Sequence, residues 1–201
     1  MVESSSSIKY RLALIGSTGA IGREICDHIK KDSRFSEVIL LCRKPLEEWK
    51  VDEWIPKLTI ISMENFDSFE NAKAQLQGVD AFLCCLGTRV KVGEQLFTKI
   101  DHTYPLEFCK LAKELGVKHY GLLSSTGADT KGILLYTRTK GLAERDCTEA
   151  NPKGLIIYRP GLLLNRRNDE RWGEKVGAWV PFLDKIESRD MGEAMIEGAI
   201  S

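Results

Sequence analysis

Six short apolar runs, each followed by a polar or helix-like stretch, constrain the fold of this chain more than any other feature. Near-continuous apolar strands are typical of a parallel sheet that is covered on both faces. Their alternation with helices predicts a single α/β domain, a doubly wound parallel sheet with helices on both faces. The runs are YRLALIG (10–16), EVILLCR (37–43), KLTIIS (57–62), VDAFLCCLG (79–87), HYGLLSS (119–125) and GLIIYRPG (154–161).

The length of 201 residues fits one domain with its own core. We expect a disordered tail over residues 1–8 and a single α/β domain over 9–201. Within that domain, residues 162–201 contribute a small substrate-side or lid region. An equally weighted alternative is a surface loop followed by a helix that caps the core. The aromatic residues that suggest a lid are Trp172, Trp179 and Phe182.

Charge and cysteine usage narrow the class of protein further. Lys and Arg total 29, as do Asp and Glu, so the formal charge is zero, which argues against a nucleic-acid partner. No apolar run approaches a transmembrane segment, and the start lacks a secretory signal. The six cysteines form no C-x-x-C pair, so we expect buried free thiols, no metal site and a cytoplasmic location.

The stretch LIGSTGAIGREI (14–25) carries three glycines spaced G-x-x-G-x-x-G at the first predicted strand–turn–helix. Gly16 permits a sharp turn, Gly19 lets the backbone approach a pyrophosphate, and Gly22 lets the helix pack closely on the sheet. The helix N-terminus favours an anion. In this context the motif predicts a dinucleotide site whose contacts are Gly16, Ser17, Thr18, Gly19, Ala20, Ile21 and Gly22.

The end of the second predicted strand indicates which dinucleotide binds. An NAD site usually has an acidic residue there, which holds the ribose 2′-hydroxyl. This chain has Cys42 followed by Arg43 and Lys44. Because cations can bind a 2′-phosphate that a carboxylate would repel, we predict NADPH/NADP rather than NAD(H). The alternative is that Arg43 and Lys44 only solvate a strand end.

A catalytic pair is indicated by YTRTK (136–140), in which Tyr136 and Lys140 are four residues apart. On a helix both would lie on one face. A tyrosine hydroxyl shuttles protons poorly at neutral pH, and a nearby ammonium and a cationic nicotinamide favour its phenolate form. Lys140 could also bind the nicotinamide ribose. The alternative is a core aromatic residue beside a surface lysine.

Two further segments follow predicted strands. Ser124 and Ser125 end the fifth strand, at the carboxyl edge where open α/β sheets bind ligands, and a serine hydroxyl there can hold a substrate carbonyl oxygen. Pro160 and Gly161 end the sixth strand, where they could bring the backbone against the nicotinamide.

Together these motifs resemble the short-chain dehydrogenase/reductase superfamily. The segments CCLGT (84–88), AKELGVKHYGLLSSTGAD (112–129), YTRTKG (136–141) and YRPGLLL (158–164) look like the atypical members grouped around the Tat-interacting protein. The resemblance implies a Rossmann-like fold that binds NADPH, with Ser125, Tyr136 and Lys140 as catalytic residues. It implies further cofactor contacts, with Leu86 to Thr88 on the adenine-ribose side. They are Arg43, Lys44, Leu86, Gly87, Thr88, Ser124, Tyr136, Lys140, Arg159, Pro160, Gly161 and Leu162.

Two functions follow as alternatives. The first is an NADPH-dependent oxidoreductase that reduces a carbonyl substrate by hydride transfer, with the Ser-Tyr-Lys set at its site. The second is a regulatory protein of the growth or apoptosis type, which binds NADPH but acts through a protein partner with little or no turnover. A third interpretation, an α/β domain without cofactor, is disfavoured by the combined motifs.

Overall fold

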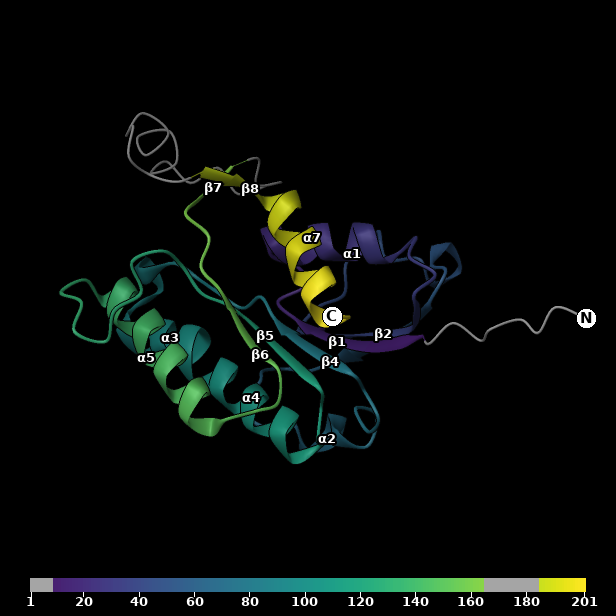
Figure 1. The fold of residues 1–201 in the computed structure, drawn as a ribbon, viewed down its shortest axis with the longest axis horizontal. Coiled ribbons are helices and arrows are strands. Elements are labelled where there is room, and N and C mark those ends of the chain that lie inside the picture. The colour runs from purple at the N-terminus through teal and green to yellow at the C-terminus, as the bar shows by residue number, and fades with distance from the viewer. Residues whose placement is uncertain (1–8, 165–184) are drawn as a thin grey trace, which may run out of the picture.

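The computed structural model describes residues 9–164 and 185–201. Six parallel strands form one sheet in the order β3-β2-β1-β4-β5-β6 (Figure 1), so the strand order reverses between β1 and β4. The predicted α/β doubly wound fold is confirmed, and each of the six apolar runs contributes one strand. The strands are β1 (Tyr10–Ile15), β2 (Phe35–Cys42), β3 (Lys57–Ser62), β4 (Ala81–Cys84), β5 (His119–Leu123) and β6 (Leu155–Tyr158).

Alternate residues of the central strands supply two separate halves of the core. Leu12 and Leu14 of β1 pack into one hydrophobic cluster, whereas Ala13 and Ile15 pack into the other. All four side chains are fully buried. This double burial explains why the strands read as continuous apolar runs rather than as an alternating pattern.

Helices cover both faces of the sheet. One face carries α1 (Ala20–Ile29) and α7 (Ser188–Ala199), which pack against each other. The opposite face carries α2 (Glu70–Lys73), α4 (Tyr104–Glu114) and α5 (Leu135–Ala150), as Figure 1 shows. In the part of the chain that the structure describes, no helix combines the length and hydrophobicity needed to cross a membrane.

Shorter elements connect these layers. A π-helical turn, η3, joins α3 to α4 without a break, and β7 pairs in parallel with β8 outside the main sheet. These shorter elements are η1 (Val51–Glu53), η2 (Val90–Val92), α3 (Glu94–Thr98), η3 (Lys99–Thr103), β7 (Leu162–Leu164) and β8 (Lys185–Glu187).

The region 162–201 is described only at its two ends. Met191, Met195 and Ile196 of α7 are buried in the hydrophobic cluster that α1 also covers, so this helix completes the core of the domain. The three aromatic residues that suggested a lid lie outside the described residues, as does the expected tail over 1–8.

The two adjacent cysteines, Cys84 and Cys85, lie on opposite sides of the sheet. Cys84 packs in the cluster that α4 covers, whereas Cys85 packs in the cluster on the α7 side. All six cysteines are free and buried.

A buried carboxylate connects three strands at the amino-terminal edge of the sheet. Glu37 of β2 accepts hydrogen bonds from Nε of Arg11 in β1 (2.8 Å) and Oγ1 of Thr59 in β3 (2.7 Å). It also pairs with Lys57 of β3 at 2.9 Å. Burial acts to raise the pKa of Glu37, but hydrogen bonds from Lys57, Thr59 and Arg11 outweigh it and lower that pKa from 4.5 to about 2.

Glu37→Gln should therefore destabilise the protein in a pH-dependent way. Because the folded-state pKa is depressed, the stabilisation is present above the unfolded pKa near 4.5 and is lost as pH falls towards about 2. The free energy of unfolding at pH 7 should fall by about 3 kcal/mol at most. Urea unfolding at several pH values measures this, with the exposed Glu70→Gln as control. An equal loss for Glu37→Gln at pH 7 and at pH 2 would contradict the assignment.

The turn between β1 and α1 depends on a glycine at its first position. Gly16 has a φ of +82°, and a Cβ there would overlap the backbone of Cys85, just after β4. The backbone N–H of Cys85 donates to the carbonyl oxygen of Ile15 at 2.9 Å, which keeps the two segments in contact. Only glycine combines this φ with this close approach.

Gly16→Ala should destabilise the fold more than the strained φ alone would. The matched control is Gly116→Ala, because Gly116 has a φ of +67° but no atom within 4 Å of an added Cβ. The control should lower the free energy of unfolding by about 1–2 kcal/mol, the usual cost of a left-handed residue. Gly16→Ala should lower it by at least twice that amount, as measured by urea unfolding followed by circular dichroism. Equal losses in the two variants would show that the contact with Cys85 relaxes freely.

Candidate functional site

The predicted site residues converge on one edge of the sheet because all six strands are parallel and end on the same side. The β1–α1 turn lies at the point where the strand order reverses, between the ends of β2 and β4. Such a switch point is where open α/β sheets form their ligand crevice. The serine pair after β5 and the Pro-Gly segment after β6 lie along the same edge.

The turn itself has the features of an anion site. Helix α1 begins after Gly19 without a side-chain cap, so the N–H groups of its first turn keep their capacity for an anion. The N–H of Gly19 donates to the carbonyl oxygen of Gly16 at 3.0 Å. Nε of Arg23 donates to the carbonyl oxygen of Thr18 at 3.1 Å and so holds the outer part of the turn.

The third glycine of the motif serves the turn rather than the sheet. A Cβ on Gly22 would overlap the carbonyl oxygen of Gly16 and the Cα of Ser17. Gly22 therefore lets the first turn of α1 lie against the preceding loop, whereas the sequence suggested packing on the strands.

Three buried hydroxyls at the strand ends match a polar ligand. Ser17, Ser124 and Ser125 are each at most 8% exposed. Within residues 9–164 and 185–201, their Oγ atoms have no hydrogen-bond partner. Because buried polar groups are normally paired, orphaned hydroxyls at the carboxyl edge fit the phosphate and ribose oxygens of a dinucleotide. Ser124 and Ser125 are alike in this respect.

The two cations that indicated NADP are at the surface. Arg43 and Lys44 directly follow β2, the neighbour of β1, and both are exposed. They are therefore accessible to a phosphate that extends from the β1–α1 turn.

Helix α5 presents the predicted catalytic pair. Tyr136 lies in its first turn and is half-buried, with its ring 6.1 Å from that of the fully buried Phe97. Lys140 follows one turn later on the same side of the helix and is buried. Phe97 of α3 is therefore a support for the tyrosine that the sequence did not reveal.

Lys140 is held by a buried ion pair. Its Nζ is 2.9 Å from Oδ1 of Asp101 in η3, and the two side chains are 7% and 1% exposed. Oδ2 of Asp101 accepts the backbone N–H of Thr88 at 2.8 Å. Burial acts to lower the pKa of Lys140, but the Asp101 carboxylate and, to a smaller extent, Tyr136 and Cys84 together raise that pKa above its usual value. Lys140 is thus an ammonium at neutral pH.

The segment after β4 lies closer to this pair than the sequence suggested. An added Cβ on Gly87 would be 3.9 Å from Nζ of Lys140 and 3.4 Å from Oδ1 of Asp101. The backbone N–H of Thr88 is already used by Asp101. Leu86 to Thr88, expected on the adenine-ribose side, therefore pass beside the lysine that was expected to bind the nicotinamide ribose.

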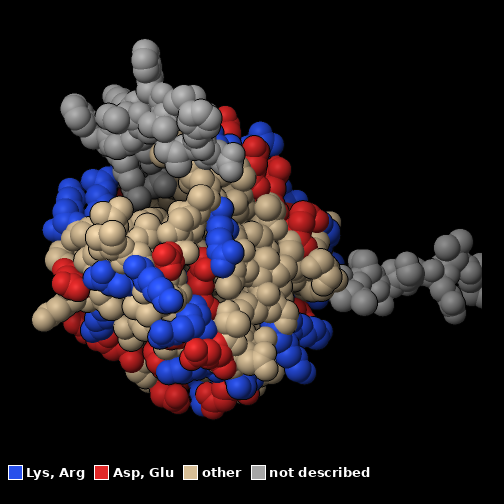
Figure 2. Space-filling view, turned by 60° about the vertical axis from the view of Figure 1, so that its left-hand side comes forward, with Lys and Arg blue, Asp and Glu red and all other residues tan. Residues whose placement is uncertain are grey.

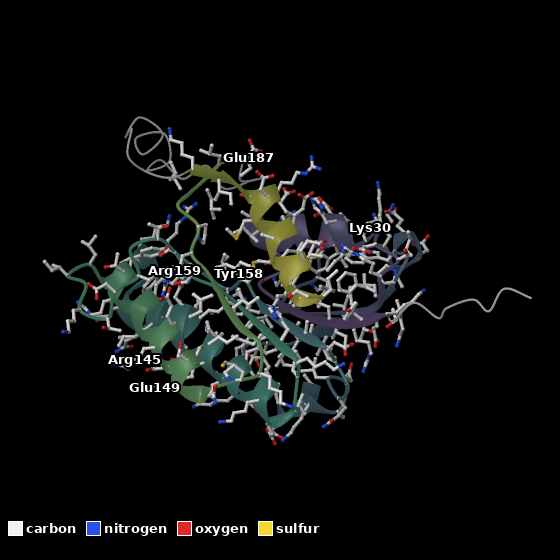
Figure 3. The ribbon with its side chains drawn as sticks, in the orientation of Figure 1. Lys30, Arg145, Glu149, Tyr158, Arg159 and Glu187 are labelled. Atoms are coloured by element: carbon white, nitrogen blue, oxygen red, sulfur yellow. The ribbon has the colours of Figure 1, made fainter. Side chains whose placement is uncertain are left out.

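Arg159 differs from the other expected cofactor contacts. Its guanidinium makes two hydrogen bonds to the Glu144 carboxylate of α5, at 2.9 Å and 2.6 Å. Figure 3 shows Arg159 on the same side of the molecule as Arg145 and Glu149 of α5. The side chain is thus engaged at the α5 side of β6, and its backbone carbonyl accepts from Oγ1 of Thr126 at 3.1 Å.

The Pro-Gly segment is tied to the serine loop through the backbone. The N–H of Thr126 donates to the carbonyl oxygen of Pro160 at 2.8 Å, and that of Ser124 donates to the carbonyl oxygen of Tyr158 at 2.8 Å. These bonds hold the loops after β5 and β6 together. Leu162 opens β7 and continues away from the main sheet.

On the face in Figure 2, acidic and basic side chains are interspersed, without a field of one sign. Among the described residues, no group of three or more His, Cys, Asp or Glu side chains could hold a metal ion.

Comparisons with known proteins agree with this geometry. The sequence matches the NAD(P)H-binding family over residues 16–197. It is 35% identical over 162 residues to Protein HTATIP2 of Rattus norvegicus, covering 80% of this chain and 66% of that protein. It is 30% identical over 204 residues to the protein named FMP52, mitochondrial, of Lodderomyces elongisporus, covering 94% and 86%. The chain thus spans less than two thirds of the rat relative.

Similar solved structures support the fold. MoeE5 in complex with UDP-glucose and NAD has a TM-score of 0.73 at 14% identity, covering 94% of this chain and 71% of that one. The PhqB reductase domain of Penicillium fellutanum has a TM-score of 0.73 at 16% identity, covering 99% and 66%. From the matched family, the relatives and the strand order together, we conclude that this chain belongs to the NAD(P)H-binding family and shares the short-chain dehydrogenase/reductase-like Rossmann fold.

Proposed function

We propose that the protein is an NADPH-dependent oxidoreductase that reduces a carbonyl substrate. The observation that carries this proposal is the buried ammonium of Lys140 one helical turn from Tyr136. A buried cation beside a tyrosine is expensive to maintain, and it is the arrangement that favours a phenol as proton donor at neutral pH.

The cofactor would lie along the carboxyl edge of the sheet. Its pyrophosphate would bind the first turn of α1 and Oγ of Ser17, because both have unused hydrogen-bonding capacity. A 2′-phosphate would reach the exposed cations Arg43 and Lys44 after β2. Lys140 would bind the nicotinamide ribose, next to the backbone of Gly87.

Each site residue then has one role in the reaction. A bound dinucleotide would supply the hydride for the carbonyl carbon of the substrate. Ser125 donates a hydrogen bond to the carbonyl oxygen, where negative charge develops. Tyr136 donates a proton to that oxygen, which completes the alcohol. Ser124 is the alternative donor, because its buried Oγ is also without a partner among the described residues.

Substitution of Tyr136 distinguishes the reductase from the regulatory protein. Tyr136→Phe keeps the ring that packs near Phe97 but removes the proton donor. If the protein is an enzyme, kcat should fall by about 100-fold or more while the Kd for NADPH changes by less than about threefold. Stopped-flow oxidation of NADPH with a panel of aldehydes and ketones measures the first quantity, and NADPH fluorescence measures the second.

The matched control for this test is Tyr104→Phe, because Tyr104 lies on α4 and its hydroxyl donates to Asp67 at 3.0 Å, away from Lys140. Its kcat should stay near the wild-type value. No measurable turnover in the wild-type protein, with NADPH binding intact, would instead favour the regulatory function through a protein partner. Equal measurable turnover in Tyr136→Phe and wild type would exclude Tyr136 as the proton donor.

The preference for NADPH over NADH is tested at Arg43. Arg43→Ala should weaken NADPH binding by about tenfold, since it removes a charge-assisted contact to the 2′-phosphate, and should change NADH binding by less than about twofold. Fluorescence titration with both nucleotides gives the ratio. Lys31→Ala, an exposed cation just after α1, is the control and should alter neither affinity. Tighter binding of NADH than of NADPH by the wild-type protein would overturn the cofactor assignment.

The compartment remains a prediction. The six cysteines are free and buried, which is compatible with the reducing cytoplasm expected from the sequence. The fungal relatives carry the word mitochondrial in their names.

A further inference from the structure

A buried carboxylate outside the Ser-Tyr-Lys set contacts two of the segments from which the site is built. Asp101 is 1% exposed, and each of its carboxylate oxygens has a separate task. Oδ1 pairs with Nζ of Lys140 on α5, and Oδ2 accepts the N–H of Thr88 in the loop after β4. One side chain therefore links the predicted lysine to the loop that passes beside it.

The local backbone explains how Asp101 reaches both partners. It lies at the centre of the π-helical turn η3 between α3 and α4. Such turns are rare and often occur at functional sites, because they redirect side chains that a regular helix would place elsewhere. The next residue, His102, also contacts α5, with its Nε2 2.7 Å from Oδ2 of Asp146. The turn thus docks on α5 at two neighbouring points.

The two contacts differ in their surroundings. The side chains of His102 and Asp146 are each 19% exposed, and Asp146 also pairs with the exposed Arg145. The Asp101–Lys140 pair is far more enclosed. A surface-accessible pair contributes little, whereas an enclosed ammonium that loses its carboxylate is strongly disfavoured. The His102–Asp146 pair is therefore a suitable control for the Asp101–Lys140 pair.

We infer that Asp101 is a positioning residue for cofactor binding: it fixes the ammonium of Lys140, and the loop at Thr88, in the arrangement that receives the nicotinamide half of the dinucleotide. The inference rests on the proposed function and extends it by one residue. Asp101 acts only through Lys140 and Thr88.

The role of Asp101 can be measured through the pKa of Lys140, which depends on the charged groups around it. The groups that influence its ammonium are Asp101 on η3, Tyr136 on its own helix and Cys84 on β4. Asp101 is the strongest of them and raises the pKa of Lys140 against the effect of burial. With an uncharged residue at position 101, burial would dominate and the lysine would lose its proton at a lower pH.

Asp101→Asn is the direct test, because the amide oxygen can still accept the N–H of Thr88 while the negative charge is lost. The Kd for NADPH, measured by fluorescence, should rise about tenfold. The pH midpoint of Lys140, followed by its ¹³Cε resonance in ¹³C-lysine-labelled protein, should fall by about one unit or more. Asp146→Asn, which disturbs the neighbouring contact between the same elements, should leave both quantities near wild type.

A double-mutant cycle separates positioning from general damage. In a Lys140→Gln background there is no ammonium to orient, so adding Asp101→Asn should change the Kd for NADPH by less than about twofold. The double variant carries no isolated buried charge, so it can still be compared with Lys140→Gln if Asp101→Asn alone does not fold.

Three results would overturn the inference. They are an unchanged Kd and an unchanged Lys140 midpoint in Asp101→Asn, an equal loss of affinity in Asp146→Asn, and a further large loss when Asp101→Asn is added to Lys140→Gln. A wild-type protein that binds NADPH but reduces no carbonyl would overturn only the proposed reaction, because the affinity and titration results still decide the role of Asp101. A wild-type protein without affinity for NADPH would overturn both.

Discussion

Parallel pairing of β1 with both β2 and β4 is the constraint on which the rest of this structure depends. It places the β1–α1 turn between two strand ends, at the one position where the strand order reverses. The turn can occupy that position only because Gly16 lets it approach the backbone of Cys85. Open α/β sheets bind their ligands at such a position.

The second requirement is the packing of α5 against α4 and η3. Phe97 supports the ring of Tyr136, and Asp101 holds the ammonium of Lys140. Both supporting residues come from the continuous segment α3–η3–α4, so one stretch of chain orients the two predicted catalytic side chains. Groups that are held in this way lose little freedom when a ligand binds, which is the basis of preorganised sites.

The sequence was a good guide where the signal was local. The apolar runs located all six strands, because strands buried on both faces must be apolar along their whole length. The glycine spacing located the turn, although Gly22 packs against that turn and not against the sheet. Arg159 shows where local reasoning was insufficient, since its guanidinium pairs with Glu144, a residue 15 positions earlier in the chain.

The sequence by itself determined the fold class, the dinucleotide turn and the order of the predicted site residues, because periodicity, glycine conformation and helical spacing act over a few residues. Only the tertiary structure decided that Asp101 pairs with Lys140 across 39 positions of chain and that the loop after β4 lies beside this pair. In sequence, Asp101 resembles any polar residue of an amphipathic helix. Its burial, and therefore its strength as a partner, exists only once η3 has packed on α5.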